Sequence, residues 1–492
     1  MVAASKPTNK SASKAGAPIM QLGKKRTSKL PNILKSKCVE GDLTSGSFFS
    51  GMENGLRPLQ YVLQTLFGPN VHVKQKFAID KDRACQRFLK ANIASDCVIY
   101  GDVKNVNLAR LPYVDFLWYS PPCNKYSQQG KQQGWEASSD HRDGTLVNFP
   151  LEYIRRHQPL VAVMEQVPTI KTKHFGVYSY IMHSLRRIGN CCCSVTDHVV
   201  DTKDYGVPQR RKRLYIVALH KSAVPSIPVF QMPAPLPVPS LESYFDMQLK
   251  GCLDDVPDYS IPNLFEAMKK VFKKGGNPCT ETWIMDILGG GKNWVTVEKN
   301  LCPTITANRG YGGGYFISNL MRFTTHEELA KLQGVNMQGV VIPDTVSIKQ
   351  FKKMVGNAVS SNVSGIIFFQ ILNAMKCSRN ARAAKRTRLV ASDFALHVYE
   401  APPADGAQDS VTELTTGHPL LDQHLRRVNL RRKRRHLAER LALEHEEGGA
   451  PAEPKHRAAP RPWSSEHPRR RCQGPQKGQA VRRADLRARH SG

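Results

Sequence analysis

The residues from Asp115 to Gly130 read DFLWYSPPCNKYSQQG, and the fold predicted for the chain is built around this stretch. Val114 to Tyr119 is apolar and aromatic, as in a buried strand, and Ser-Pro-Pro ends that strand abruptly. Cys123 is therefore expected on a loop at the end of a strand. The two prolines before it fix the backbone and remove two amide donors. Such a loop suits a nucleophile, although an inert buried cysteine is the alternative for any one of the twelve cysteines.

The 492-residue chain is strongly basic, with a formal net charge of +30. Its length fits one large domain with extensions, or two to three modest domains. Nineteen of the thirty net positive charges lie in residues 1–40 and 378–492, which show no apolar periodicity. We expect both ends to be disordered and basic, and the charge indicates a polyanionic partner.

The cysteines and the apolar runs exclude further classes of protein. The cysteines are irregularly spaced, and no Cys/His cluster predicts a metal site, which favours a reducing compartment. No apolar run reaches the roughly eighteen residues that a membrane helix needs. We therefore expect neither a metal nor a membrane partner.

Before Cys123, the stretch SFFSGMENGLRPLQYVLQTLFG, which starts at Ser47, predicts a strand, a turn and an amphipathic helix. Gly51 and Gly55 lie in the turn. Free amides at the start of the helix would lie beside any cofactor bound there. An ordinary strand-to-helix turn is the alternative, because it uses glycine in the same way.

Two further predicted strands on this side of Cys123 end in acidic residues. Lys76 to Ile79 is followed by Asp80, which in a doubly wound sheet is placed to accept hydrogen bonds from ribose hydroxyls. Cys97 to Tyr100 is followed by Asp102 after one glycine, where a carboxylate could bind an adenine amine. Each acid alone also fits a helix cap or a solvated turn. Their order along successive strand ends favours a cofactor site.

After Cys123, the apolar strand from Leu160 to Met164 ends in Glu165. This residue belongs either to a capped turn or to a functional site at the carboxyl edge of the sheet. The run QRRKR, residues 209–213, leads directly into Leu214 to Leu219, which has the composition of a central strand. Arginines that enter a buried strand fit poorly with the alternative of a solvated basic patch.

The composition and the hydrophobic periodicity of the chain change near residues 221 and 300. Residues 221–300 are Pro-rich, with poor periodicity, and predict a separate lobe. Beyond them, a capped helix is expected over Thr325 to Gln333, and a last helix is expected from Lys349 through Val355 to about Met375. The predicted divisions are a basic arm, a catalytic and cofactor-binding domain, the lobe, a return to the catalytic domain and a basic tail: 1–40, 41–220, 221–300, 301–377 and 378–492.

In this order, the motifs resemble those of the DNA (cytosine-5) methyltransferases over roughly residues 46–375. The resemblance implies an α/β fold with a doubly wound, mostly parallel, Rossmann-like sheet and a smaller target-recognition lobe. Eight stretches carry it: FFSG at 48–51 with a following glycine, Asp80, Gly101-Asp102, SPPCN at 120–124, EQV at 165–167, QRRKR at 209–213, RFTTHEELAKLQG at 322–334 and GNAV at 356–359.

The resemblance also implies the reaction, which is methyl transfer from S-adenosylmethionine to carbon 5 of cytosine in double-stranded DNA. A thiolate adds to carbon 6 of a flipped base, and a carboxylate at ring nitrogen 3 and nearby arginines stabilise the adduct. The implied catalytic residues are Cys123, Glu165, Arg211 and Arg213. The implied cofactor-binding residues are Phe49, Gly51, Gly55, Asp80, Asp102, Pro122 and Asn357.

The chain departs from the family pattern at several positions. Ser47 stands where many members have an acid, and Glu53-Asn54 replaces a glycine pair. Tyr119 replaces a glycine before Pro-Pro-Cys, and Gln166 replaces an asparagine. The nucleophile and the acid are intact.

Two other functions share parts of this pattern. A transfer-RNA cytosine-5 methyltransferase has the same motif order, but members of that group usually carry a Cys-Phe-Thr triplet, which is absent before residue 322. A chromatin-binding protein with an inactive methyltransferase fold would not need Cys123 and Glu165. Basic runs at 24–26 and 431–435 predict a nuclear location; the alternative is an organelle, if the basic arm is a transit peptide.

Overall fold

The computed structural model describes residues 33–35, 42–123, 126, 146–190, 193–223 and 230–377. These residues all lie in one compact unit of the chain. The predicted basic tail, and the predicted basic arm apart from 33–35, lie outside the described residues, as does most of the run that follows Cys123.

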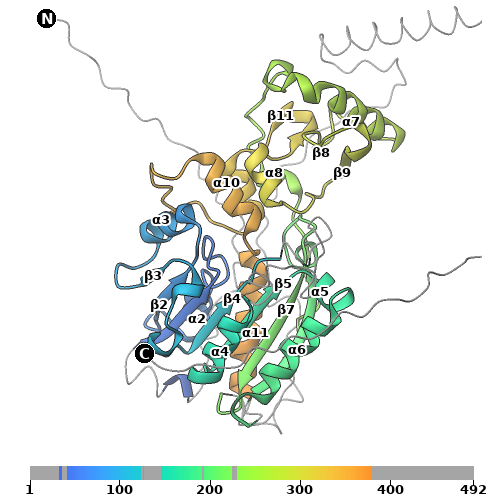
Figure 1. Cartoon of the computed structure of the whole chain (residues 1–492). Coiled ribbons are helices and arrows are strands. Elements are labelled where there is room, and N and C mark those ends of the chain that lie inside the picture. The colour runs from blue at the N-terminus through green and yellow to red at the C-terminus, as the bar shows by residue number, and fades with distance from the viewer. Residues whose placement is uncertain are drawn as a thin grey trace, which may run out of the picture. The chain divides into compact units, whose positions relative to one another are not determined.

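A seven-stranded sheet forms the larger part of the described structure (Figure 1). Its strand order is β3-β2-β1-β4-β5-β7-β6. The first five strands are parallel to their neighbours, while β7 runs antiparallel to both β5 and β6. The predicted mostly parallel α/β sheet is confirmed. Its strands are β1 (Leu43–Phe48), β2 (Val73–Ile79), β3 (Val98–Tyr100), β4 (Phe116–Tyr119), β5 (Val161–Gln166), β6 (Cys193–Asp201) and β7 (Lys212–His220).

Helices cover both faces of this sheet, which explains why its central strands are apolar throughout. All four residues of β4 are buried. Phe116 and Trp118 pack on one face with Phe368, whereas Leu117 and Tyr119 join the core on the other face. This alternation follows from the two-residue period of a strand. The first face is covered by α2 (Leu59–Phe67) and α11 (Ser361–Cys377), and the second by α4 (Asn148–His157) and α6 (Phe175–Arg187).

The order of the strands reverses between β1 and β4. From β1 the chain adds β2 and β3 on one side, and from β4 it adds β5, β7 and β6 on the other. Ligands of doubly wound sheets bind at the carboxyl ends of the strands beside such a switch point. The glycine turn leaves β1 and the Pro-Pro-Cys loop leaves β4, so the two predicted motifs start from neighbouring strand ends.

A second sheet contains four antiparallel strands in the order β11-β10-β8-β9. Helix α7 (Ile261–Lys273) packs on β8 and β9. The sheet takes two strands from the predicted lobe and two from beyond residue 300, so that predicted boundary falls within one sheet. Its strands are β8 (Trp283–Asp286), β9 (Thr296–Lys299), β10 (Phe316–Ile317) and β11 (Arg322–Phe323).

The predicted last helix is divided in two. Helix α10 (Ile348–Asn357) ends at Ala358, whose backbone is extended, and α11 follows after a bend of 42°. No single helix in the described ranges is long and apolar enough to cross a membrane, although this bent pair meets the length and composition together. Helix α10 packs closely on α8 (Ala307–Gly312), where a Cβ on Gly310 would lie 2.0 Å from the carbonyl oxygen of Lys352.

Shorter helices complete the described chain. Helix α9 (His326–Leu332) has the predicted Thr325 cap, in a capping box with Glu328. The other α-helices are α3 (Arg83–Asn92) and α5 (Thr169–Thr172). Turns of 3-10 helix occur at Val103–Asn105, Leu108–Arg110, Ile188–Asn190, Thr202–Asp204, Leu241–Tyr244, Leu253–Asp255, Asp258–Ser260, Lys292–Trp294 and Ser318–Leu320.

Candidate active site

Three neighbouring strands bring Cys123, Glu165 and Arg213 to one edge of the sheet. Cys123 follows β4, and Glu165 lies near the end of β5. Arg213 lies on the adjacent antiparallel strand β7, so it reaches this edge at the strand's start. Its Nε lies 2.9 Å from Oε1 of Glu165, and both side chains are largely buried, with 14% and 11% exposed. A charged pair beside a half-buried thiol is the central feature of the site.

The surroundings of Cys123 act on its thiol in opposite directions. Burial raises the pKa of the Cys123 thiol, and the Glu165 carboxylate raises it further. Arg213 and Arg211 lower it. The arginines therefore act in the predicted direction but are outweighed, and the thiol keeps its proton in the ligand-free protein.

Arg211 connects the sheet to more distant segments. Its Nη1 donates to the carbonyl oxygens of Ile305 at 2.9 Å and Gly356 at 3.4 Å, and its backbone N–H donates to Asp201. Burial lowers the pKa of this guanidinium to about 9. In this arrangement Arg211 holds the backbone before α8 and at the end of α10. Its contact with a substrate base stays a prediction.

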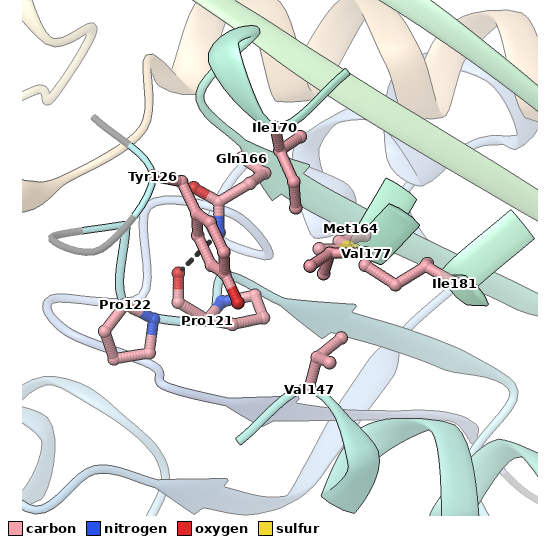
Figure 2. Close-up of a pocket in the computed structure, with 9 residues that line it drawn as sticks. All are labelled: Pro121, Pro122, Tyr126, Val147, Met164, Gln166, Ile170, Val177 and Ile181. Atoms are coloured by element: carbon pink, nitrogen blue, oxygen red, sulfur yellow. Dashed lines mark hydrogen bonds between the residues drawn. The ribbon is translucent and has the colours of Figure 1, made fainter. Parts of the chain in front are cut away.

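Gln166, at the position of the usual asparagine, supports the Pro-Pro-Cys loop from behind. Its Nε2 donates to the carbonyl oxygen of Pro121 at 3.1 Å, the bond that is dashed in Figure 2. Its Oε1 accepts from the backbone N–H of Val167 at 2.9 Å. The extra methylene relative to asparagine leaves the side chain able to satisfy both groups, so this departure is compatible with an ordered loop.

Tyr126 is a support of the loop that the sequence analysis missed. Its ring is buried, with 4% exposed, and its backbone N–H donates to the carbonyl oxygen of Cys123 at 2.9 Å. Thr169 donates to the Tyr126 carbonyl oxygen, and His174 packs edge-on against the ring. Figure 2 shows the ring beside Pro121 and Gln166, at a cavity of about 10 Å³ that Pro122 also lines. The only sequence signal was an aromatic residue three positions after the cysteine.

The two glycines of the first turn have different physical roles. Gly51 has a φ of 56° and open space where a Cβ would be, and its N–H donates to Asp80 Oδ2 at 2.8 Å. A Cβ on Gly55 would lie 2.3 Å from the Trp118 indole, so Gly55 permits close packing on β4. Phe49 also has a positive φ, of 58°. A strained turn with open space at Gly51 is compatible with a ligand that approaches its backbone.

The acids that were expected to bind the cofactor also order the backbone. Asp80 Oδ1 accepts from the N–H of Asp82 at 2.9 Å, and burial raises the pKa of Asp80. A carboxylate has about four acceptor sites, so Asp80 can accept further hydrogen bonds. Asp102 accepts from the N–H of Lys104 as a helix cap. Asn357 is exposed at the end of α10.

Asn54 joins this turn to the start of α11. Its Nδ2 donates to the carbonyl oxygen of Val359 at 3.1 Å, and its own carbonyl oxygen accepts from Ser361 and Ser364. The segment around 356–359, which contains the predicted cofactor-binding residue Asn357, therefore returns beside the first turn. These features fit an adenosyl cofactor: open space at Gly51, an acid at the end of β2 and a chain segment that closes the turn. In the described part of the chain, no group of three or more His, Cys, Asp or Glu residues could hold a metal ion.

Comparison with known proteins gives a consistent result. The family model for C-5 cytosine-specific DNA methylases matches residues 44–373. Type II methyltransferase M.NgoBI of Neisseria gonorrhoeae is 27% identical over 290 residues, covering 58% of this chain and 81% of that protein. Type II methyltransferase M.HhaI of Haemophilus parahaemolyticus is 27% identical over 282 residues, covering 55% and 80%.

Among solved structures, the Entamoeba histolytica methyltransferase EhMeth aligns with a TM-score of 0.46 and 18% identity, over 68% of this chain and 98% of that one. The match of the family model spans more than half of the chain and every motif described above. The chain belongs to the C-5 cytosine-specific DNA methylase family and transfers a methyl group from S-adenosylmethionine to carbon 5 of cytosine in DNA.

Proposed function

We propose that Cys123 is the nucleophile of this reaction and that it acts on a cytosine flipped out of double-stranded DNA. The observation that carries the proposal is the ion pair between Glu165 and Arg213 beside the thiol. Carbon 5 of cytosine is a weak nucleophile until a thiolate adds to carbon 6. S-adenosylmethionine, when bound, supplies the methyl group as a sulfonium electrophile.

Glu165 and Arg213 divide the stabilisation of charge between them. As sulfur bonds to carbon 6, the electron pair of the ring moves toward nitrogen 3 and the carbonyl oxygen. Glu165 binds or protonates nitrogen 3, and Arg213 donates to the carbonyl oxygen. Arg213 also holds the Glu165 side chain in place before the base arrives, because the two are already paired at 2.9 Å. Once carbon 5 carries the methyl group, its proton passes to water, and the electron pair left on carbon 5 re-forms the ring double bond and expels the Cys123 thiolate from carbon 6.

The thiol must lose its proton when the base binds. The Cys123 thiol is protonated in the ligand-free protein, because burial and Glu165 raise its pKa. When Glu165 takes up the proton that the thiol releases and shares it with nitrogen 3 of the base, its repulsion of the thiolate is lost and the attraction of Arg213 remains. The thiolate therefore forms mainly when substrate is in the site.

Carbon 6 is hidden in stacked DNA, so the base must leave the helix, which costs a few kcal/mol. Contacts to phosphates offset this cost, and helix α7, which packs on the second sheet, offers basic side chains for them. Lys269 is 72% exposed on α7. The basic ends of the chain add positive charge, and the runs at 24–26 and 431–435 would direct the protein to a nucleus.

The decisive experiment is covalent trapping. The parent should form a stable adduct with a duplex that carries 5-fluorocytosine, in the presence of cofactor, since fluorine at carbon 5 prevents release. Cys123→Ser should form none and should lose roughly 10⁴-fold or more in turnover, while its cofactor affinity stays unchanged. Adduct formation by the serine variant would remove Cys123 from the mechanism. A transfer RNA with the same fluorinated base tests the alternative substrate; preferential trapping of the RNA would overturn the assignment to duplex DNA.

A further inference from the structure

Glu53 lies in the turn between β1 and α2 in a backbone conformation that favours glycine. Its φ is 64°, and its side chain is buried, with 4% exposed. A residue with a Cβ is strained in this region unless its surroundings hold it there. Gly51, two positions earlier, has a similar φ of 56° and open space beside it. A glutamate at the buried end of this turn therefore needs an explanation other than backbone preference.

The carboxyl group of Glu53 connects the turn to the first two strands. Its Oε2 accepts from Ser47 Oγ at 2.7 Å and from Gln75 Nε2 at 2.8 Å. Ser47 is fully buried in β1, so its small side chain leaves room for the carboxyl group. Both donors are neutral. Among the described residues, Oε1 of Glu53 has no hydrogen-bond partner and is also buried.

Charged and titratable groups from three directions act on this carboxyl group. Arg57 attracts it, but the Arg57 guanidinium donates to the carbonyl oxygen of Met52 at 3.2 Å. Asp80, which binds Gly51, repels it. Its charge also disfavours ionisation of the Cys97 thiol. Desolvation is the largest effect and raises the pKa of Glu53 to about 7. Among the described residues, no cation forms an ion pair with this buried acid, which lies in the turn over residues 49–55 (the cofactor turn).

We propose that Glu53 is a specificity-determining residue that makes the cofactor turn selective for the positively charged methyl donor over its neutral thioether product. This rests on the assignment of the turn to the cofactor. The sulfonium of S-adenosylmethionine brings a positive charge that can attract the ionised Glu53 carboxyl group. The thioether of S-adenosylhomocysteine is neutral and brings no such charge. Bound donor therefore favours the ionised form of Glu53, and release of product returns its proton. The selectivity reduces product inhibition at the end of each turnover.

The sign of the pH dependence follows directly. Glu53 is neutral well below pH 7 and ionised well above it. Attraction for a cation therefore grows as the pH rises through about 7. Donor and product carry the same amino and carboxyl groups, so the ratio of their dissociation constants isolates the effect of the sulfonium charge. A shift of one pKa unit on binding corresponds to a tenfold change in that ratio.

The test is calorimetric titration of the full chain with both ligands at pH 6 and pH 8. For the parent, the ratio of the product's Kd to the donor's Kd should rise about fivefold between these values, which is the part of the tenfold change that falls within this range when donor binding lowers the pKa from about 7 by one unit. Glu53→Gln keeps the shape and an acceptor for Ser47 and Gln75 but has no charge, so its ratio should not change with pH. The control Glu152→Gln, on α4, removes an acid that pairs with arginines at the surface and should behave as the parent does.

A measurement on the parent alone covers a variant that fails to fold. Titrations in two buffers of different ionisation enthalpy give the number of protons released, which should be larger for the donor than for the product near pH 7. Equal release for both ligands, or a pH-dependent ratio in Glu53→Gln, overturns the proposal. No cofactor binding by the parent would overturn the assignment of the turn, and the proposal with it. None of these outcomes depends on Cys123, because no methyl transfer is measured.

Discussion

Two buried glutamates lie at strand ends of the seven-stranded sheet: Glu53 in the turn after β1 and Glu165 near the end of β5. They differ in which groups balance the charge of the carboxylate. Glu165 has the Arg213 guanidinium at 2.9 Å. Within the part of the chain that the structure describes, Glu53 has only a hydroxyl and an amide in hydrogen-bond contact, and its pKa is raised to about 7. A buried carboxylate is costly unless it is paired. The paired residue can act on a neutral base with its geometry already set, whereas the unpaired residue favours a ligand that brings a positive charge.

The largest effect on the methylation rate should come from breaking the ion pair between Glu165 and Arg213. Glu165→Gln should lower the methylation rate by about 10²- to 10⁴-fold, because the amide neither protonates nitrogen 3 nor holds Arg213 by charge. Cofactor affinity should change little, since the residue acts on the base. Single-turnover rates and calorimetry on the same preparation separate the two effects. Unchanged rates would show that the pair is structural only.

The Glu53 carboxyl group, which has no ion-pair partner among the described residues, should affect the stability of the protein in a pH-dependent way. The folded pKa of Glu53, about 7, lies above the ordinary glutamate value of 4.5. The carboxyl group therefore favours folding below about pH 4.5, and this contribution is lost as the pH rises to 7. Glu53→Gln avoids the loss, so it should gain up to about 3 kcal/mol over the parent between pH 5 and pH 8. Urea unfolding of both proteins at the two pH values measures it; a constant difference would contradict the raised pKa.

The acids around the cofactor turn should differ from each other in a measurable way. Asp80 binds Gly51 in the turn, whereas Asp102 caps a short helix after β3. Asp80→Ala should weaken S-adenosylmethionine binding by about 10- to 100-fold. The substitution removes a hydrogen-bond acceptor for the cofactor and also the bond that holds the Gly51 turn. Asp102→Ala should weaken it less, by about tenfold or under. Both should bind cofactor-free DNA as the parent does, which a filter-binding assay checks. Parental affinity in both variants would reduce these acids to turn residues.

The smallest effect concerns charge outside the sheet. Removal of residues 1–40 and 378–492 takes away nineteen net positive charges and should reduce the slope of DNA affinity against salt concentration. The rate at saturating DNA should survive, because the paired site lies within residues 123–213. Titrations at several salt concentrations give the slope. An equal slope in the truncated protein would mean that these ends do not contact phosphates.

The proposed nuclear location needs its own test. A reporter protein fused to residues 378–492 should enter the nucleus, and a fusion that stays in the cytoplasm would show that the tail carries no nuclear localisation signal.

The sequence predicted the fold where local pattern and tertiary environment agree. Apolar runs such as Phe116 to Tyr119 are buried on both faces, so their strands could be read directly. The last helix was predicted as one segment because residues 358–360, Ala-Val-Ser, contain neither glycine nor proline. The break there comes from the extended backbone at Ala358, beside the contact of Asn54 with Val359. Composition alone does not reveal such a long-range contact.

The residue types and the order of the motifs were determined by the sequence alone, because a thiol, a carboxylate and arginines at strand ends already specify the chemistry. The tertiary structure decided which of these side chains meet. It pairs Arg213 with Glu165, directs Arg211 to the backbone of Ile305 and Gly356, and places the Glu53 carboxyl group against Ser47. The physical reason is that pairing and desolvation depend on neighbours from other strands, and those neighbours are fixed only when the sheet has formed.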